Sequence, residues 1–370
     1  MRVKLKEAFD LQMGKTPARN NVEFWDGTHK WISIADLGNA GKYINSTKER
    51  ISDEGIEASG IKMVPKGTVI MSFKLSIGKT AITSEDMYTN EAIMAFLSKR
   101  IYEIDVDYLY HLCCGTNWGA GTNKAVMGLT LNKATLSEYE IELPDISGQR
   151  EIARKLDKLD SIIARRKAQL VTLDELVKSR FIELFGTYPG NEKGWNTENI
   201  RDVVSEVRYG SSRPAVDGGR YPYLRMNNIT YGGELDLSDT KRIDIPDNEL
   251  AKCTVRRGDV LFNRTNSKEL VGKTCVYNRD EMMVLAGFVI RVRVNEKVLP
   301  EFLSAFLNTD FSKKMLLGMC KTAIGQANIN AQELQNIGLY VPPIDLQQEF
   351  VDFKIQVDKS KHFSELEVAA

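Results

Sequence analysis

Residues 149–185 read QREIARKLDKLDSIIARRKAQLVTLDELVKSRFIELF, a stretch with neither glycine nor proline. Apolar residues recur along it in steps of four and three, which is the spacing of a coiled-coil seam. The seam consists of Ile152, Leu156, Leu159, Ile163, Leu170, Leu173, Val177 and Leu184, and it is interrupted only by Arg166 and Arg180. The pattern predicts one long helix, roughly 55 Å at about 1.5 Å per residue, that packs along a narrow face against one partner helix.

Both ends of this predicted helix are marked in the sequence. Ser147 offers an N-cap oxygen, and Gly186 followed by Pro189 is typical of a helix end. We therefore expect a spacer helix over residues 147–186. The alternative, a core helix of one large domain, fits less well because two arginines lie on the apolar seam.

The composition is that of a globular protein with more than one domain. Of the 370 residues, 42% are hydrophobic and 27% are charged, so two domains of ordinary size are expected. The 50 basic and 50 acidic residues cancel, and any binding of nucleic acid must therefore come from local patches. The N-terminus lacks the apolar core of a signal peptide, and no apolar run approaches the length that spans a membrane. We expect a cytoplasmic protein without membrane contact.

Cysteine and histidine are sparse. The five cysteines are odd in number and form no Cys-x-x-Cys pair, which fits reduced thiols better than disulfides or zinc ligation. With only three histidines in the chain, we expect no metal site.

The two halves of the chain repeat each other. The block LNKATLSEYEIELPDISGQREI from Leu131 matches INAQELQNIGLYVPPIDLQQEF from Ile329 at a constant offset of 198 residues (347 − 149 for the glutamines). Further matches lie upstream in the same order: Gly67-Thr68-Val69-Ile70 with Gly258-Asp259-Val260-Leu261, Gly78-Lys79-Thr80 with Gly272-Lys273-Thr274, and Trp31-Ile32-Ser33-Ile34 with Tyr223-Leu224-Arg225-Met226. Duplication of a domain together with a following helix explains this order.

Each half therefore follows one plan. A globular region rich in short β-like runs ends in an apolar strand and a proline, and a helix then leaves it. The second helix begins near Leu346, carries Phe350, Phe353 and Val357 as its apolar positions, and is shorter than the first. The fold class is α+β, with similar mixed α/β domains over residues 1–146 and 187–343, the spacer helix over 147–186 and a C-terminal helix over 344–370.

The motifs GDVLFNRTNSKELVGKTCVY from Gly258 and GQANINAQELQNIGLYVPPIDLQQEF from Gly325 make the chain resemble a known family. It is similar to the specificity subunits of type I restriction-modification systems, over nearly its whole length. The resemblance implies two target recognition domains that each read one half of a split DNA site. It also implies that the two helices pair as an antiparallel coiled coil, with a pseudo-twofold relation between the repeats. The second helix ends at Ala370, so we expect a shortened partner for the central helix.

The same resemblance implies how the work is divided among subunits. The chain would bind double-stranded DNA, methyltransferase (M) subunits and restriction/translocase (R) subunits. Adenine methylation and DNA cleavage would be carried out by those partners, so the chain itself is expected to be noncatalytic and to bind no cofactor. S-adenosylmethionine, ATP and magnesium are expected on the partner subunits.

Catalytic motifs are missing where an enzyme of DNA modification needs them. An adenine methyltransferase holds its base with a tetrad of a polar residue, two prolines and an aromatic residue, but the only Pro-Pro pair stands in Val341-Pro342-Pro343-Ile344. A P-loop needs a glycine five residues before Gly-Lys-Thr, and those positions hold Phe73 and Ser267. We expect no catalytic residue, although a stand-alone methyltransferase or nuclease with diverged motifs stays open as an alternative, as does a coiled-coil scaffold that binds protein.

Polar and basic residues in the predicted loops are the candidates for DNA contact, because Arg pairs with guanine, Asn and Gln with adenine, and Lys with phosphate. In the second half they are Arg208, Tyr209, Ser211, Arg213, Arg225, Asn227, Asn228, Arg264, Asn266, Lys268, Gln326 and Asn328. In the first half they are Lys15, Ser33, Lys74, Ser76, Lys79, Asn123 and Lys124. Any one of them can equally be an ordinary surface residue, and the group carries weight because Arg264-Thr265-Asn266-Ser267 lies in the block most like the family.

Overall fold

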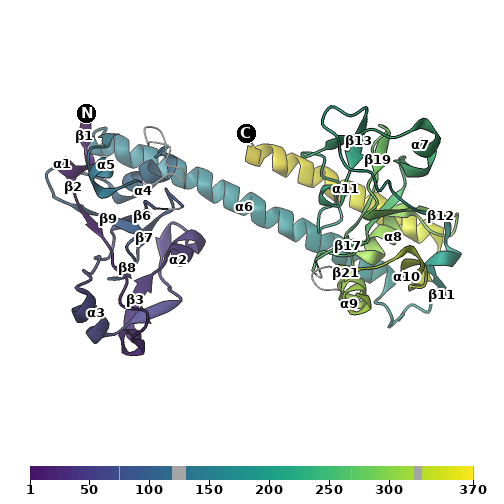
Figure 1. Ribbon diagram of the computed structural model, residues 1–370, viewed down its shortest axis with the longest axis horizontal. Helices are drawn as coiled ribbons and strands as arrows, with labels where there is room; N and C mark the ends of the chain where they lie inside the picture. The colour runs from purple at the N-terminus through teal and green to yellow at the C-terminus, as the bar shows by residue number, and fades with distance from the viewer. Residues whose placement is uncertain (75, 119–130, 268, 321–326, 370) are drawn as a thin grey trace. The chain divides into compact units, whose positions relative to one another are not determined.

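The computed structural model describes residues 1–74, 76–118, 131–267, 269–320 and 327–369 (Figure 1). The chain divides into two compact units, Met1–Ile162 and Ile163–Ala370. The division falls inside the long helix α6 (Ile146–Phe185), so each unit keeps a part of that helix.

The first unit is a mixed α/β domain. Its strands are β1 (Arg2–Lys4), β2 (Phe9–Met13), β3 (Trp25–Ile32), β4 (Tyr43–Ile44), β5 (Glu49–Ile51), β6 (Val69–Ser72), β7 (Thr80–Thr83), β8 (Tyr88–Thr89), β9 (Ile93–Ser98) and β10 (Glu140–Glu142). Its helices before α6 are α1 (Leu5–Ala8), α2 (Ile34–Asn39), α3 (Asp53–Ser59), α4 (Val106–Gly115) and α5 (Lys133–Ser137), with a short 3-10 turn η1 (Val22–Phe24).

The main sheet of this unit has the order β2-β9-β6-β7-β4, and a smaller sheet has the order β5-β3-β8. Strand β6 is buried on both faces, which explains why it reads as a continuous apolar run. Val69 and Met71 enter one apolar cluster, with residues of α4, and Ile70 enters another on the opposite face.

The second unit contains more elements. Its strands are β11 (Asn196–Asn199), β12 (Val204–Tyr209), β13 (Tyr221–Leu224), β14 (Lys241–Ile243), β15 (Thr254–Val255), β16 (Val260–Asn263), β17 (Thr265–Asn266), β18 (Thr274–Val276), β19 (Met283–Leu285), β20 (Val289–Val294), β21 (Ala327–Asn328) and β22 (Gly338–Val341). Its helices after α6 are α7 (Asp247–Cys253), α8 (Pro300–Leu307), α9 (Asp310–Met319), α10 (Ala331–Gln335) and α11 (Ile344–Ala369), with 3-10 turns η2 (Ile200–Asp202) and η3 (Met226–Asn228).

The sheets of the second unit match those of the first. The order β12-β20-β16-β18 corresponds to β2-β9-β6-β7, and every neighbouring pair in both is antiparallel. In the other sheet of each unit, β13 pairs in parallel with β19 as β3 does with β8. The predicted repeat of one α/β fold is therefore confirmed.

The predicted long helix is also present, with a different N-cap. The helix begins at Ile146, and the carboxylate of Asp145 accepts a hydrogen bond from Gly148 N at 2.8 Å. Asp145 therefore caps the helix in place of Ser147, which lies one residue inside it. At the other end Gly186 takes a φ of +82°, and its N–H donates to Ile182 O.

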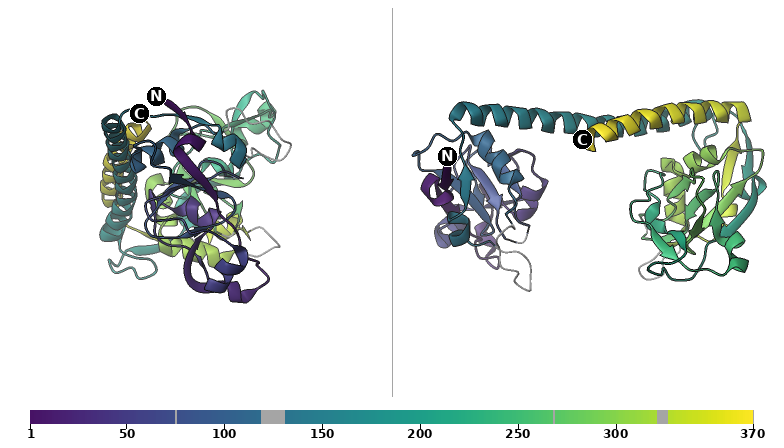
Figure 2. Two further views of the ribbon diagram at one scale, coloured as in Figure 1. Left: turned by 90° about the vertical axis from the view of Figure 1, so that its left-hand side faces the viewer. Right: turned by 90° about the horizontal axis from the view of Figure 1, so that it is seen from above.

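Helices α6 and α11 lie antiparallel in the second unit (Figure 2). Arg180 pairs with Glu349 at 2.6 Å, whereas Asp174, closer to the start of α6, pairs with Lys361, closer to the end of α11. A contact that lies closer to the start of α6 therefore lies closer to the end of α11, as expected for an antiparallel pair.

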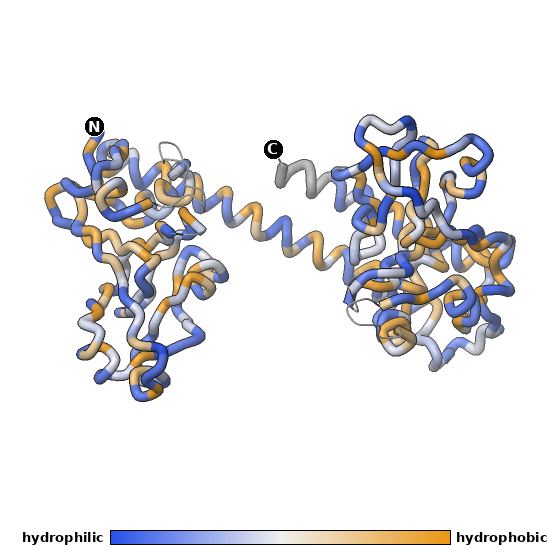
Figure 3. Tube along the Cα trace, viewed as in Figure 1, coloured by the Kyte–Doolittle hydropathy of each residue, from blue (hydrophilic) through white to orange (hydrophobic). Residues whose placement is uncertain are grey.

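The exposure of the seam residues changes along the length of α6. Figure 3 shows that hydrophilic and hydrophobic residues alternate along this helix. Ile163, Leu170, Leu173, Val177 and Leu184 are half-buried in the second unit, where Phe350 and Val357 of α11 are buried and Phe353 is half-buried. Ile152, Leu156 and Leu159, in the first unit, are 38%, 36% and 54% exposed. Their pairing with another helix stays a prediction.

Candidate nucleic-acid interface

Some of the predicted DNA-contacting residues lie on one equivalent connection in each unit. In the second unit this connection joins β16 to β18 and carries Arg264 and Asn266. In the first unit the corresponding connection joins β6 to β7 and carries Lys74, Ser76 and Lys79. The repeat therefore places the two candidate groups at equivalent points of the fold.

The backbone around Arg264 holds its side chain in a defined place. Arg264 N donates to Phe288 O at 3.0 Å, and Arg264 O accepts from Ile329 N at 2.9 Å. Its guanidinium carbon lies 4.8 Å from the ring centroid of Tyr209, within the range of a cation–π contact. The Tyr209 hydroxyl in turn accepts from Ala331 N at 2.8 Å. In the described part of the chain no carboxylate pairs with Arg264, so its charge is available to a ligand.

Two predicted asparagines lie on the pair of short strands that follows this arginine, one on each face of the pair. Strand β17 pairs with β21, with Thr265 opposite Asn328 and Asn266 opposite Ala327. The Thr265 hydroxyl donates to Asn328 Oδ1 at 3.0 Å, which fixes the orientation of that amide. We call Tyr209, Arg264, Asn266 and Asn328 the readout surface, because it combines an aromatic face, a guanidinium and two amides.

Three other predicted arginines are already paired with carboxylates. Arg213 binds both oxygens of Glu249 at 2.7 and 3.2 Å, Arg225 binds Asp239 at 2.9 Å, and Arg208 binds Glu206. Hydrogen bonding from Arg213 holds the pKa of Glu249 below its ordinary value. A base contact by any of these arginines would first have to break its ion pair.

Arg208 stands at the edge of a buried ionic network. Arg291, 2% exposed, lies 3.1 Å from Glu206, and Arg293 bridges Glu206 at 2.6 Å and Asp259 at 2.8 Å. Burial acts to raise the pKa of Glu206, but the hydrogen bond from Arg208 and the charges of Arg291 and Arg293 outweigh it, and the pKa falls below its ordinary value. The network ties β12 to β20 and β16, which is a structural role.

The position of Asn228 argues against its predicted contact with DNA. It is 1% exposed, its Oδ1 accepts from Arg225 N, and its Nδ2 donates to Asp236 O and Asp239 O. The amide is therefore consumed in holding its own loop and does not face a ligand. Its neighbour Asn227 is exposed in η3, whereas Ser211 is 5% exposed and accepts from Arg213 N.

The first-unit candidates outside the β6–β7 connection also serve local structure. Ser33 is the N-cap of α2 and accepts from Asp36 N at 3.2 Å, and the Lys15 ammonium donates to Ser59 O at 2.9 Å. Asn123, Lys124, Lys268 and Gln326 lie outside the described residues. DNA contact stays a prediction for all the candidates that are exposed.

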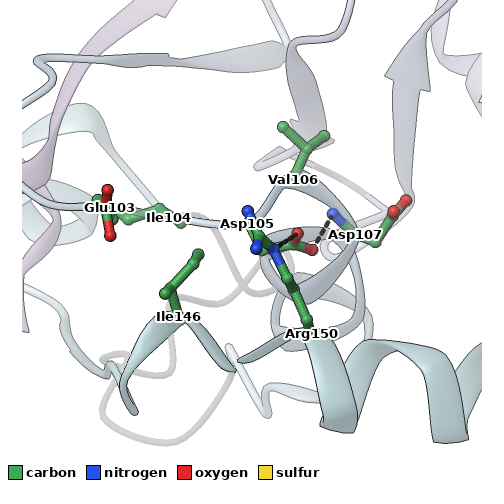
Figure 4. A pocket seen from close by; sticks show the side chains of 7 residues that line it. All are labelled: Glu103, Ile104, Asp105, Val106, Asp107, Ile146 and Arg150. Atoms are coloured by element: carbon green, nitrogen blue, oxygen red, sulfur yellow. Dashed lines mark hydrogen bonds and ion pairs between the residues drawn. The ribbon is translucent and has the colours of Figure 1, made fainter. Parts of the chain in front are cut away.

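A shallow hollow of about 480 Å³ lies in the first unit where α6 leaves the domain (Figure 4). The carboxylate of Asp105 in its wall accepts from Asp107 N and Tyr108 N at the start of α4, and lies 3.7 Å from Arg150. This carboxylate caps a helix and pairs with an arginine. The hollow is therefore explained as a structural contact between the domain and α6 and not as an acid–base site.

Three basic residues that sequence reasoning passed over lie together beside the β16–β18 connection: Lys178 on α6, Lys273 at the start of β18 and Lys313 on α9. Lys178 and Lys313 have no distinguishing local sequence, and Lys273 stands in the repeated Gly-Lys-Thr triplet. Only the fold brings them together.

Metal-ligand clusters and membrane helices are both missing from the part of the chain that the structure describes. Within these residues no group of three or more His, Cys, Asp or Glu side chains is placed to hold a metal ion. The same residues contain no helix that is both long and apolar enough to cross a membrane.

Comparison with known proteins places both halves of the chain in one family. The family model described as "Type I restriction modification DNA specificity domain" matches residues 1–172 and 192–366. The chain is 26% identical over 260 residues to the type I restriction enzyme MjaIX specificity subunit of Methanocaldococcus jannaschii, which covers 64% of this chain and 59% of that protein. It is 27% identical over 237 residues to the EcoKI specificity subunit of Escherichia coli K12, covering 60% of this chain and 51% of that protein.

The chain thus spans between about half and three fifths of the length of these two relatives. In fold it is similar to the S subunit of a type I restriction-modification system from M. genitalium, with a TM-score of 0.52 at 12% identity over all of this chain and 92% of the other. The family match covers most of the chain and repeats in both of its units. The chain therefore belongs to the family of type I restriction-modification DNA specificity domains.

Proposed function

We propose that this chain is the subunit that selects the DNA sequence for a type I restriction-modification complex. Each unit would read one half of a split site in double-stranded DNA. The observation that carries the proposal is the repeated hairpin connection, which carries basic side chains at the same point of two equivalent domains. Two equivalent recognition domains in one chain fit a target with two half-sites.

The chemistry of the chain supports a noncatalytic role. The Gly-Lys-Thr motif of the second unit lies in a hairpin, where the Lys273 ammonium donates to Met226 O at 3.0 Å and is 7% exposed. A phosphate-binding loop would need that ammonium free to reach a nucleotide. The comparisons support the specificity role and not a stand-alone methyltransferase or nuclease.

The proposed complex assigns the remaining chemistry to partners. Methyltransferase subunits would bind S-adenosylmethionine and methylate adenine, and restriction subunits would use ATP and magnesium to move and cleave DNA in the cytoplasm. This chain would bind no cofactor of its own. The M subunits are the partners we expect to dock on the helices, since the apolar side chains of Ile152, Leu156 and Leu159 are exposed there.

An exchange of recognition domains tests the proposal. Residues 1–145 are replaced by the equivalent region of a related specificity subunit, and the methylated motif is mapped in genomic DNA before and after. We expect one half-site to change and the other to be kept. A motif that changes in both halves, or in neither, would contradict the modular reading.

The readout surface is tested by Arg264→Ala. If Arg264 contacts a guanine, the variant should lose about 1 to 3 kcal/mol of binding to the cognate duplex and relax specificity at one base pair. If it contacts only phosphate, all duplexes should bind more weakly by the same factor. Arg257→Ala is the matched control, because Arg257 is exposed and already paired with Asp280 at 2.7 Å.

A further inference from the structure

Three lysines lie near one another in the described part of the second unit. The Lys313 ammonium donates to Gly272 O at 3.0 Å, and the Lys273 ammonium donates to Met226 O at 3.0 Å. Both acceptors are neutral carbonyl groups. Lys178 on α6 is exposed and close enough for its charge to act on Lys313. Among the described residues none of the three forms an ion pair.

The arrangement disfavours the charged form of Lys313. Burial, and after it the positive charges of Lys273 and Lys178, together lower the pKa of Lys313 to about 8. The Lys313 ammonium also lies 5.3 Å from the ring centroid of Tyr231, whose face attracts cations only weakly. A cation in such a place is destabilised until an anion approaches it.

Another buried lysine of the same unit, Lys361, has carboxylate partners. Lys361 on α11 has a side chain only 12% exposed, and it lies between Asp174 of α6 and Glu234. Burial acts to lower its pKa, but the hydrogen bond that Lys361 donates to Asp174 and the charge of Glu234 outweigh it, and the pKa of Lys361 is raised. The fold thus supplies carboxylates to a lysine that serves only structure. Among the described residues no carboxylate pairs with Lys313, which leaves that role open to an external anion.

The position of the cluster indicates which anion this is. Asn263 N donates to Lys273 O and Gly272 N donates to Asn263 O, both at 2.8 Å, and Arg264 follows directly. The lysines therefore stand at the base of the same connection that carries the readout surface. A duplex read at Arg264 brings its charged backbone to this edge of the domain, and lysine binds phosphate as a point charge.

We propose that Lys178 and Lys313 form a binding site for a backbone phosphate of the DNA, beside the half-site read by the second unit, and that the buried charge of Lys273 only adds to the positive field there. This inference rests on the proposed function. Such a contact positions the duplex against α6 and α9 and carries no sequence information, so it is a site separate from the readout surface.

The salt dependence of DNA binding tests the site. The full chain, with its methyltransferase partners, is titrated with the cognate duplex and with a scrambled duplex of equal length, at salt concentrations between about 50 and 200 mM. For Lys313→Gln we expect the slope of log K against log salt to fall by about 0.9, and the affinity near 0.1 M salt to fall roughly eightfold for both duplexes. Lys314→Gln, which removes an exposed charge one residue further along α9, should keep the slope and affinity of the unchanged protein.

A second variant protects the test against misfolding. Lys178 is exposed in the middle of a helix, and Lys178→Gln keeps the helix propensity, so this variant folds even if Lys313→Gln does not. It should lower the slope in the same way. Unchanged slopes in the folded variants, or an equal loss for Lys314→Gln, would overturn the proposal.

Two further arms separate the sources of phosphate and the two proposals. Inorganic phosphate is added without DNA while thermal unfolding is followed. If it raises the unfolding midpoint of the unchanged protein but not of Lys313→Gln, and the DNA slopes stay the same, the site takes a free anion and the DNA assignment is wrong. If the unchanged protein does not distinguish the cognate from the scrambled duplex, the proposed function fails, while the slopes still decide whether the lysines bind DNA phosphate.

Discussion

Gln149 and Gln347 occupy the same place in the two units and make the same hydrogen bonds. Gln149 accepts from Asp105 N and donates to Glu103 O and Pro144 O. Gln347 accepts from Leu299 N and donates to Lys297 O and Pro342 O. The two side chains are 1% and 0% exposed, so each amide locks the first turn of its helix to the domain that the helix leaves.

Loss of this amide should be costly. Gln347→Leu leaves one N–H and two carbonyl groups buried without their partner, and we expect the free energy of unfolding to fall by about 2 to 4 kcal/mol. Gln348→Leu, at the exposed neighbouring position, should change it by less than about 0.5 kcal/mol. Urea unfolding of both variants measures the difference. Equal stabilities would show that the amide does not anchor the helix.

Lys313 should make stability depend on pH in a direction opposite to that of an ordinary paired lysine. Burial and the neighbouring positive charges together lower the pKa of Lys313 to about 8 in the folded chain, against 10.5 for an ordinary lysine. Between these pH values the unfolded chain holds the proton and the folded chain does not, so the free energy of unfolding rises with pH. The groups that face Lys313 are Lys178, Lys273 and the ring of Tyr231. A substitution of Lys313 leaves these groups unchanged, so their own contributions to stability cancel when the variant is compared with the unchanged protein.

We therefore expect Lys313→Met to be more stable relative to the unchanged protein at about pH 7 than at about pH 10, by on the order of 1 to 2 kcal/mol. Denaturant unfolding at the two pH values measures the change. Lys314→Met is the control, since its side chain is exposed. A difference of the opposite sign would mean that Lys313 is stabilised by its charge.

Single residues show where sequence reasoning stops. The offset of 198 pairs Gln149 with Gln347, yet a sequence cannot tell that both amides are buried. Asn227 and Asn228 are adjacent and chemically identical, but only the fold turns the second inward. Arg264 was predicted as the main candidate, whereas the lysine cluster was not, because its members come from elements far apart in the sequence.

At the scale of elements, periodicity predicts the central helix to within a residue of Ile146–Phe185. It does not predict that Phe181 and Phe185, beside the seam, are buried in the second domain. Their partner Phe350 comes from a helix of the other repeat, with ring centroids 5.3 Å from Phe181 and 5.8 Å from Phe185. Local spacing identifies the helix, while its second apolar face needs the tertiary fold.

This aromatic contact should dominate the docking of α11. Phe350→Ala removes a fully buried ring and leaves a cavity against the end of α6, so we expect a loss of about 3 to 5 kcal/mol in the free energy of unfolding. Ile355→Ala on the same helix is the control, because Ile355 is 46% exposed and should cost less than about 1 kcal/mol. Thermal or urea unfolding of the full chain compares them. A similar cost for both would mean that α11 is not held by this contact.

At the scale of the whole molecule, the duplication was visible in the sequence because the helix-entry blocks kept their spacing. The structure extends the match to the strand order of both main sheets, although the sequences between the markers differ in length. Strand pairing survives such changes because loops absorb them. The recognition loops are the part that sequence comparison could not place, since nothing in the repeat constrains their side chains.

The central helix should act as a ruler between the two half-sites. Four residues inserted between Gln169 and Leu170 lengthen the helix by about 6 Å and turn its later part by about 40°. The insertion lies before Asp174 and Arg180, so the contacts of these residues with α11 are retained. We expect both half-site sequences to stay the same and the unread spacer between them to grow by about one or two base pairs.

Mapping the methylated motif before and after the insertion measures the spacer directly. A control that replaces Lys167 and Gln169 with alanine keeps the length of the helix and should keep the spacer, since both side chains are exposed. The inserted turn should also lower the yield of active complex, because it displaces the exposed residues Ile152, Leu156 and Leu159 along the helix from the second unit. If the complexes with the insertion methylate a motif of unchanged spacing, the distance between the half-sites is set by contacts other than the length of α6.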